Sequence, residues 1–140
     1  MTLAVKISLL FSGLYLLTGM LTGVWKYAKI MSSDERKAPV YVDIAHRNAL
    51  MFSFASLVIA KLVEYSPFGP SGQVVVVALP FFFFVVTSAG QITEGLKNST
   101  ENIFLKPDPV RNIFMYGLVA GEVGSIALLV GGFIYTQFFV

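Results

Sequence analysis

His46 has the widest chemical range of any side chain in this sequence, and it is the only histidine among the 140 residues. An imidazole binds haem iron, ligates other metals, transfers protons or simply forms hydrogen bonds. A zinc site of the usual kind needs three or four protein ligands, and the chain has no second histidine and no cysteine. Haem needs only one axial protein ligand, so the composition favours haem over a discrete metal ion. The alternative is a histidine at the membrane interface, satisfied by water and lipid headgroups.

Small residues follow His46 on its own face of the predicted helix. Ala49, Ser53, Ser56 and Ala60 recur at intervals of three or four residues, which places them in one smooth stripe. Either a neighbouring helix or a flat ring fits against such a stripe. We therefore take His46, Ala49 and Ser53 as candidate cofactor-binding residues, with His46 as the metal ligand.

Thr93, Lys97 and Glu122 are the candidates for catalysis. Glu122 lies within a long apolar stretch, where a carboxyl group is costly unless it faces the bundle interior or water. Its possible roles are a proton donor, a partner for a basic group, or a neighbour of a haem carboxylate through a cation; the alternative is a carboxyl group near the interface. Thr93 and Lys97 belong to a polar segment that approaches the same side as His46, although a helix end that enters water gives the same pattern.

The elements that position these residues are four apolar segments. Hydrophobic residues make up 56% of the chain, charged residues 13%, and the mean hydropathy is +0.75, which indicates an integral membrane protein. The segments cover roughly residues 3–27, 44–63, 73–94 and 110–139, each about the ~20 residues that cross a bilayer as a helix. We expect a single all-α domain over residues 1–140, an integral membrane four-helix bundle.

Glycines mark the faces on which these helices pack. Gly19 and Gly23 form a GxxxG pair in the first span, and Gly117, Gly121 and Gly124 cluster in the fourth. Small residues at such spacing let helix backbones approach closely within lipid. The pattern does not specify the partner helix or the size of an oligomer.

Basic residues predict the orientation in the membrane. Most of them flank the first and third connections, and only Lys6 and Lys61 belong to the opposite side. By the positive-inside rule the first and third connections are cytoplasmic and both termini lie outside, in a bacterial or archaeal inner membrane. His46 is then near the cytoplasmic surface. The formal charge of +2 is too small to indicate a nucleic acid as a partner.

The sequence AHRNAL at Ala45–Leu50 carries two related resemblances. It resembles the RAHxNxLE signature of the membrane-associated eicosanoid and glutathione metabolism family, whose members are four-helix membrane trimers. It is also similar to the second helix of the styrene oxide isomerase family, small four-helix membrane enzymes that bind haem b through the histidine of this motif. The long polar third connection and the Gly131–Tyr135 segment fit the layout of the isomerases.

The chain departs from both families at specific positions. Ile44 and Met51 replace the arginine and glutamate with which the glutathione family handles its charged tripeptide. The asparagine and tyrosine that face the epoxide in the isomerases fall near Met51 or Phe52 and at Lys97. His46 is the residue carried over, as the iron ligand.

The resemblance implies a haem-b-binding membrane protein that packs as a homotrimer. If it is catalytic, ferric haem would act as a Lewis acid on a small lipophilic substrate that arrives through the membrane lipid, and an epoxide would rearrange to a carbonyl compound. The alternatives are a glutathione-dependent transferase or peroxidase of the eicosanoid type, and a non-catalytic small subunit of a larger membrane complex.

Overall fold

The computed structural model describes residues 1–140, which form helices joined by short connections and no strands. The helices are α1 (Leu3–Met31), α2 (Val40–Glu64), α3 (Pro70–Lys97) and α4 (Pro109–Phe138), and a short 3₁₀ helix, η1 (Ile103–Leu105), lies between α3 and α4. All four α-helices are long and apolar enough to cross a membrane, as expected for an integral membrane protein. The prediction of an all-α protein with four helices that are able to span a membrane is therefore confirmed.

Most of the helices extend beyond the apolar segments from which they were predicted. α1 continues to Met31 instead of residue 27, and α2 begins at Val40 instead of residue 44. α3 covers Pro70–Lys97 instead of residues 73–94. The added turns mix apolar residues with charged ones such as Lys29, Asp43 and Lys97, and their backbone hydrogen bonds continue each helix past its apolar segment.

The helix ends follow from local chemistry. The Oγ1 of Thr2 accepts from the Val5 amide before α1, and the carboxylate of Asp108 accepts from the Val110 and Arg111 amides before α4. A proline follows the N-cap residue of both α3 and α4, where its missing N–H costs nothing. α3 ends at Lys97, and Asn98, which caps it, adopts a left-handed conformation with φ of 47°.

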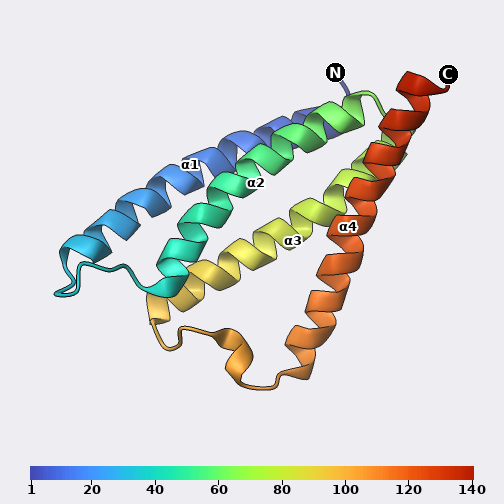
Figure 1. The fold of residues 1–140 in the computed structure, drawn as a ribbon. Coiled ribbons are helices and arrows are strands. Elements are labelled where there is room, and N and C mark those ends of the chain that lie inside the picture. Colours follow the sequence, from blue (N-terminus) through green and yellow to red (C-terminus); the bar gives the residue numbers. More distant parts are fainter.

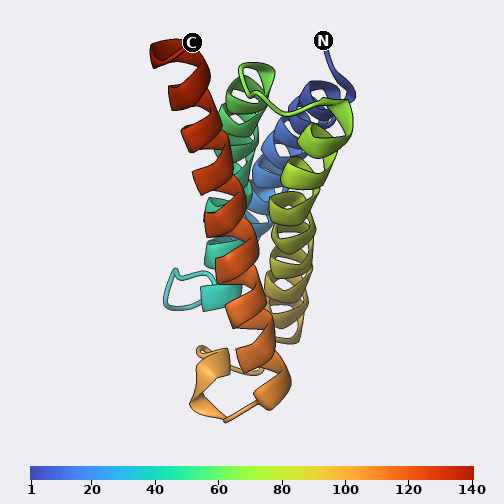
Figure 2. The same ribbon diagram turned by 90° about the vertical axis from the view of Figure 1, so that its right-hand side faces the viewer.

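Adjacent helices in the chain are also neighbours in space. α1 and α2 lie side by side along most of their length, α3 packs against both, and α4 contacts α3 and α2 but not α1 (Figure 1). α4 diverges from the other helices toward the end that carries the α3–α4 connection. Both termini and the α2–α3 turn lie at one end of the bundle, and the α1–α2 and α3–α4 connections lie at the other (Figures 1 and 2).

Stacked aromatic rings hold the centre of the bundle together. Phe11 of α1 stacks on Phe81 of α3 with ring centroids 4.4 Å apart, and Phe52 of α2 stacks on Phe84 with centroids 4.1 Å apart. Of the four consecutive phenylalanines on α3, only Phe82 is exposed. Helical geometry directs the other three rings toward neighbouring helices, so this run is mainly an internal packing element.

The GxxxG pair of α1 packs within the chain. A Cβ atom placed on Gly19 would overlap with Leu50 Cδ2, and one placed on Gly23 would lie 2.9 Å from His46 Cε1. Both glycines therefore allow α2 to approach α1 closely. Gly13, Gly124 and Gly131, by contrast, have no neighbouring atom within 4 Å of such a position.

Candidate functional site: His46 and two cavities

His46 points from α2 into the seam with α1. Its Nδ1 lies 2.8 Å from the backbone carbonyl oxygen of Gly19, and its ring lies over Gly23. A carbonyl oxygen can only accept a hydrogen bond, so Nδ1 carries the hydrogen and donates it. In the neutral ring, Nε2 then keeps its lone pair. The half-buried imidazole is thus held in the tautomer that can ligate a metal.

Ala49 and Ser53 are buried against α1. Both side chains are almost inaccessible to solvent, and the Ser53 hydroxyl donates to the Ser12 carbonyl oxygen at 2.9 Å. The smooth stripe that follows His46 is therefore covered by a neighbouring helix of the same chain. Of the three predicted cofactor-binding residues, only His46 retains partial exposure.

Asp43 joins the two helices one turn before His46. Its carboxylate lies 2.6 Å from Lys26 Nζ on α1 and 2.6 Å from the Arg47 guanidinium on α2. From the sequence these charges look like ordinary interfacial residues. The i,i+4 spacing predicts the Asp43–Arg47 ion pair from the sequence. The contact between Asp43 and Lys26, by contrast, depends on how α1 and α2 align.

A first cavity of about 540 Å³ lies between α3, α4, the connection between them and the start of α2. Thr93 and Glu94 line it, together with Arg111 from α4. The Oγ1 of Thr87 and the Oε1 of Gln91 are buried beside it without a hydrogen-bond partner. Neither His46 nor Lys97 belongs to its lining; Lys97 is exposed and lies 3.8 Å from Glu94.

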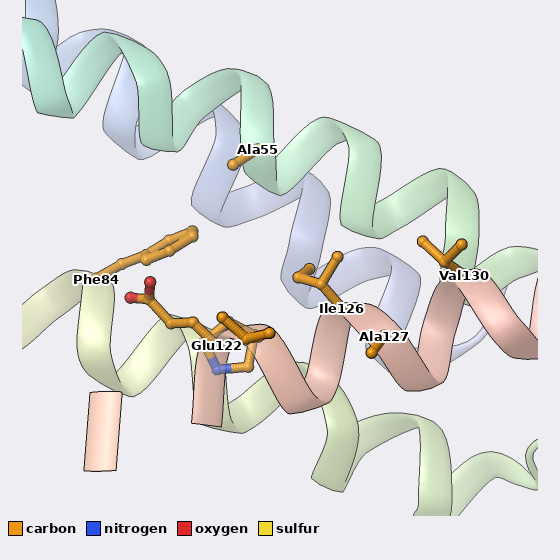
Figure 3. A pocket seen from close by; sticks show the side chains of 8 residues that line it. Ala55, Phe84, Glu122, Ile126, Ala127 and Val130 are labelled. Atoms are coloured by element: carbon orange, nitrogen blue, oxygen red, sulfur yellow. The ribbon is translucent and has the colours of Figure 1, made fainter. Parts of the chain in front are cut away.

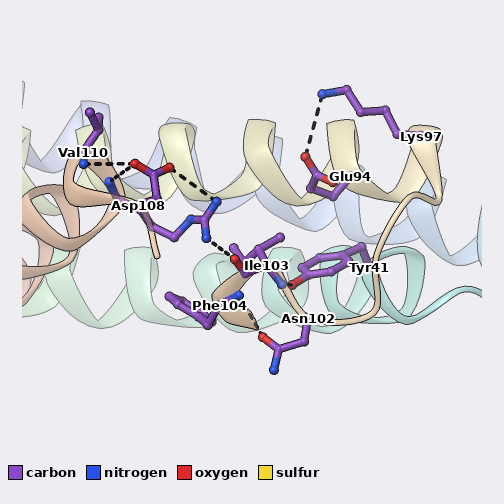
Figure 4. Close-up of polar contacts among 9 residues, drawn as sticks. Tyr41, Glu94, Lys97, Asn102, Ile103, Phe104, Asp108 and Val110 are labelled. Carbon is purple, nitrogen blue, oxygen red and sulfur yellow. Dashed lines mark hydrogen bonds and ion pairs between the residues drawn. The ribbon is translucent and has the colours of Figure 1, made fainter. Parts of the chain in front are cut away.

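The α3–α4 connection is tied to the bundle by polar contacts at the edge of this cavity (Figure 4). The Ile103 amide donates to the Tyr41 hydroxyl at 2.9 Å, which links η1 to α2. The Arg111 guanidinium donates to the Ile103 carbonyl oxygen and also lies 3.5 Å from the Asp108 carboxylate. These contacts hold the connection in place although the helices on either side diverge.

Glu122 lies in a second cavity, of about 510 Å³, between α2, α3 and α4. The other lining residues are Ala55, Pro80, Phe84, Val123, Ile126, Ala127 and Val130. In Figure 3 the carboxyl group of Glu122 extends toward the side of the cavity where Phe84 lies. Glu122 is half-buried, and its carboxyl group has no hydrogen bond or ion pair within the chain.

The predicted site residues are thus distributed over three places. His46, Ala49 and Ser53 lie at the α1–α2 seam, Thr93 and Lys97 lie at the end of α3, and Glu122 lies in the second cavity. No group of three or more histidine, cysteine, aspartate or glutamate side chains is arranged to hold a metal ion.

Comparison of the chain with protein-family models, with curated proteins and with solved structures finds no match.

Proposed function

We propose that this protein binds haem b in the membrane, with Nε2 of His46 as the single axial ligand. The observation that carries the proposal is the hydrogen bond between His46 Nδ1 and the Gly19 carbonyl oxygen. Metal-ligating histidines typically donate their second ring N–H to a carbonyl or carboxylate, which fixes the tautomer and the ring orientation. His46 has this arrangement, provided by the backbone of a packed helix.

Basic side chains next to His46 suit the carboxylates of the porphyrin. Arg47 follows His46 directly, and its side chain is 65% exposed. Lys26 and Lys29 come from the same end of α1. Because Ala49 and Ser53 are covered by α1, the outer rim of the α1–α2 seam is the part of this surface left for the porphyrin. Basic groups at that rim favour carboxylates through charge-assisted hydrogen bonds.

A homotrimer is the second part of the proposal. α4 buries only Ser125, Leu129 and Gly132, and Gly124 and Gly131 face open space. Lipid-exposed small residues permit close approach of another helix, so they support an interface between copies of the chain. A neighbouring copy would also cover a porphyrin at the rim of the seam. Native mass spectrometry from detergent tests the assembly, with a trimer as the expected mass.

The proposed reaction is the redox-neutral rearrangement of a small lipophilic epoxide to a carbonyl compound. Bound ferric haem supplies Lewis-acid polarisation of the substrate oxygen. We do not assign roles in this reaction to Thr93, Lys97 or Glu122, because none of them shares a cavity with His46. Conversion of an aryl epoxide by the purified haem-loaded protein, measured by gas chromatography, is the expected result.

An absorption spectrum tests the haem proposal. Protein expressed with a haem precursor and purified in detergent should show a Soret band that His46→Ala abolishes and that added imidazole restores. The Gly13→Ala variant is the control, because an added methyl group at Gly13 meets no neighbouring atom. Either a missing Soret band in the natural protein or an undiminished band in His46→Ala would refute the assignment.

We also propose that the end of the bundle with His46 faces the cytoplasm. The excess of basic residues at that end supports this orientation. Because the chain contains no cysteine, single-cysteine variants report orientation directly. A membrane-impermeant maleimide added to intact cells should label Ser71→Cys, at the opposite end, and should not label Ser32→Cys. The reverse pattern would invert the proposed topology.

A further inference from the structure

The cavity around Glu122 has features that the haem proposal does not use. We propose that it binds a lipophilic cation, which is an apolar molecule with an ammonium or similar positive group, and that Glu122 is the counter-charge. This inference goes beyond haem binding and does not depend on it, because Glu122 and His46 lie in separate places.

The position of Glu122 along α4 makes its carboxyl group unusual. α4 covers Pro109–Phe138, so Glu122 lies about 20 Å along the helix from its first residue, by the rise of 1.5 Å per residue. That depth falls within the hydrocarbon layer, whose thickness is about 30 Å. Ionisable side chains at such depth are costly, and they generally pair with another group or mark a functional site.

The chain itself provides no counter-charge for Glu122. No basic residue lines the cavity, and Glu122 takes part in none of the ion pairs of the structure. Glu122 also lacks a hydrogen-bond donor from a neighbouring side chain. Asp34 and Glu101 also have no ion pair, but both are exposed in the connections, so Glu122 is the one unpaired carboxyl group within a long apolar helix.

The cavity walls suit the apolar part of such a ligand. Glu122 is the only residue with a charged or hydrogen-bonding side chain in the lining, which otherwise consists of aliphatic residues, Pro80 and Phe84. The volume of about 510 Å³ lies within the usual range for small-molecule sites. A sugar, a phosphate or a hydrated metal ion would lose its hydrogen bonds in these surroundings, whereas an apolar cation would not.

The ring of Phe84 also favours positive charge. It lines the same cavity as the Glu122 carboxyl group, and the negative face of an aromatic ring attracts cations (Figure 3). Stacking on Phe52 keeps the Phe84 ring in place. Carboxylate and ring together offer negative potential within one cavity.

Tetraphenylphosphonium is a suitable probe because it is apolar, permanently charged and has no hydrogen-bond donor. Tetraphenylborate has nearly the same size and shape with the opposite charge. We expect saturable binding of tetraphenylphosphonium at one site per chain in a neutral detergent, measured by calorimetry or with the radiolabelled ion. Tetraphenylborate should not compete for this site.

Glu122→Gln removes the charge and keeps the shape of the side chain. We expect it to weaken tetraphenylphosphonium binding by about ten- to a hundredfold, the range for loss of a contact to a charged group. Glu94→Gln is the matched control at the end of α3, and we expect unchanged binding, because Glu94 does not line this cavity. Ala127→Leu should also weaken binding, since it fills the cavity but keeps the carboxyl group.

Several results would overturn the proposal. One is an equal affinity of the natural protein and Glu122→Gln for tetraphenylphosphonium, and another is competition by tetraphenylborate. Either result would show that the probe partitions into an apolar site without a counter-charge. Absence of saturable binding in the natural protein would also overturn it. If Glu122→Gln changed the oligomeric mass and the natural protein did not bind the probe, the carboxyl group would instead serve contact between copies. Monodisperse elution with unchanged helical circular dichroism confirms that each variant is folded.

Discussion

Substitution of Gly23 by alanine tests the geometry of the His46 site most directly. The added Cβ would lie 2.9 Å from His46 Cε1 and 3.2 Å from Nδ1. The imidazole cannot rotate away freely, because Nδ1 is hydrogen-bonded to the Gly19 carbonyl oxygen. The methyl group must therefore displace the ring or separate α1 from α2.

The expected destabilisation is the balance of three contributions. Overpacking costs about 1–3 kcal/mol, and loss of a hydrogen bond between membrane helices costs about 0.6 kcal/mol. Alanine favours a helix over glycine by about 1 kcal/mol in water. The net effect of Gly23→Ala on the free energy of unfolding is thus a loss of about 1–2 kcal/mol. Gly13→Ala on the same helix has open space, so only the helix-favouring contribution remains.

Unfolding in mixed micelles of dodecyl maltoside and sodium dodecyl sulfate, followed by circular dichroism, measures both variants. We expect the two substitutions to change stability in different directions. Gly23→Ala should unfold at a lower fraction of sodium dodecyl sulfate than the natural protein, and Gly13→Ala should unfold at an equal or higher fraction. The Soret band of Gly23→Ala should also decrease, because the His46 ring is displaced. Equal stability of the two variants would refute the close packing of His46 on Gly23.

Three other substitutions test contacts away from the His46 ring. Asp43→Asn removes the charge that faces Lys26 of α1 at 2.6 Å, and should cost about 0.5–1 kcal/mol at low salt and less at high salt in the same unfolding assay. Tyr41→Phe removes the acceptor of the Ile103 amide, so limited proteolysis should cleave the α3–α4 connection faster while the unfolding midpoint changes little. Gly95→Ala places a Cβ 2.8 Å from the Trp25 ring of α1 and 3.3 Å from the Val42 backbone nitrogen of α2, and should cost about 1–3 kcal/mol in the same micellar unfolding assay. An unchanged midpoint for Gly95→Ala, salt-independent loss in Asp43→Asn or unchanged cleavage in Tyr41→Phe would contradict these contacts.

Composition and apolar periodicity predict the four helices because a bilayer requires every backbone group to be paired within its own segment. The stripe of small residues after His46 is also predictable, since helical spacing alone puts Ala49 and Ser53 on one face. The group that covers this face cannot be predicted, because either a flat ring or a helix fits against small side chains. In the structure α1 covers it.

Long-range partners account for most of what the sequence does not predict. The Gly19 carbonyl oxygen that orients His46 is a backbone atom 27 residues away, and no side-chain pattern identifies it. The two cavities likewise depend on which parts of α3 and α4 lie side by side. Glu122 lies level with Pro80 and Phe84 in the middle of α3, whereas Thr93 and Lys97 lie near the end of that helix. A shared polar character does not reveal this separation along the helix axes.

The order of contacts along the bundle has a consequence for how the protein is made. α1 pairs chiefly with α2, α2 with α3 and α3 with α4, so each helix meets its main neighbour as soon as it leaves the ribosome and enters the bilayer. The Phe11–Phe81 and Phe52–Phe84 stacks join α1, α2 and α3 without a contribution from α4, so these three helices can pack as a unit before α4 docks. Docking of α4 is then the last step of biogenesis. Until that step is complete, the side of α2 and α3 that later encloses Glu122 faces lipid.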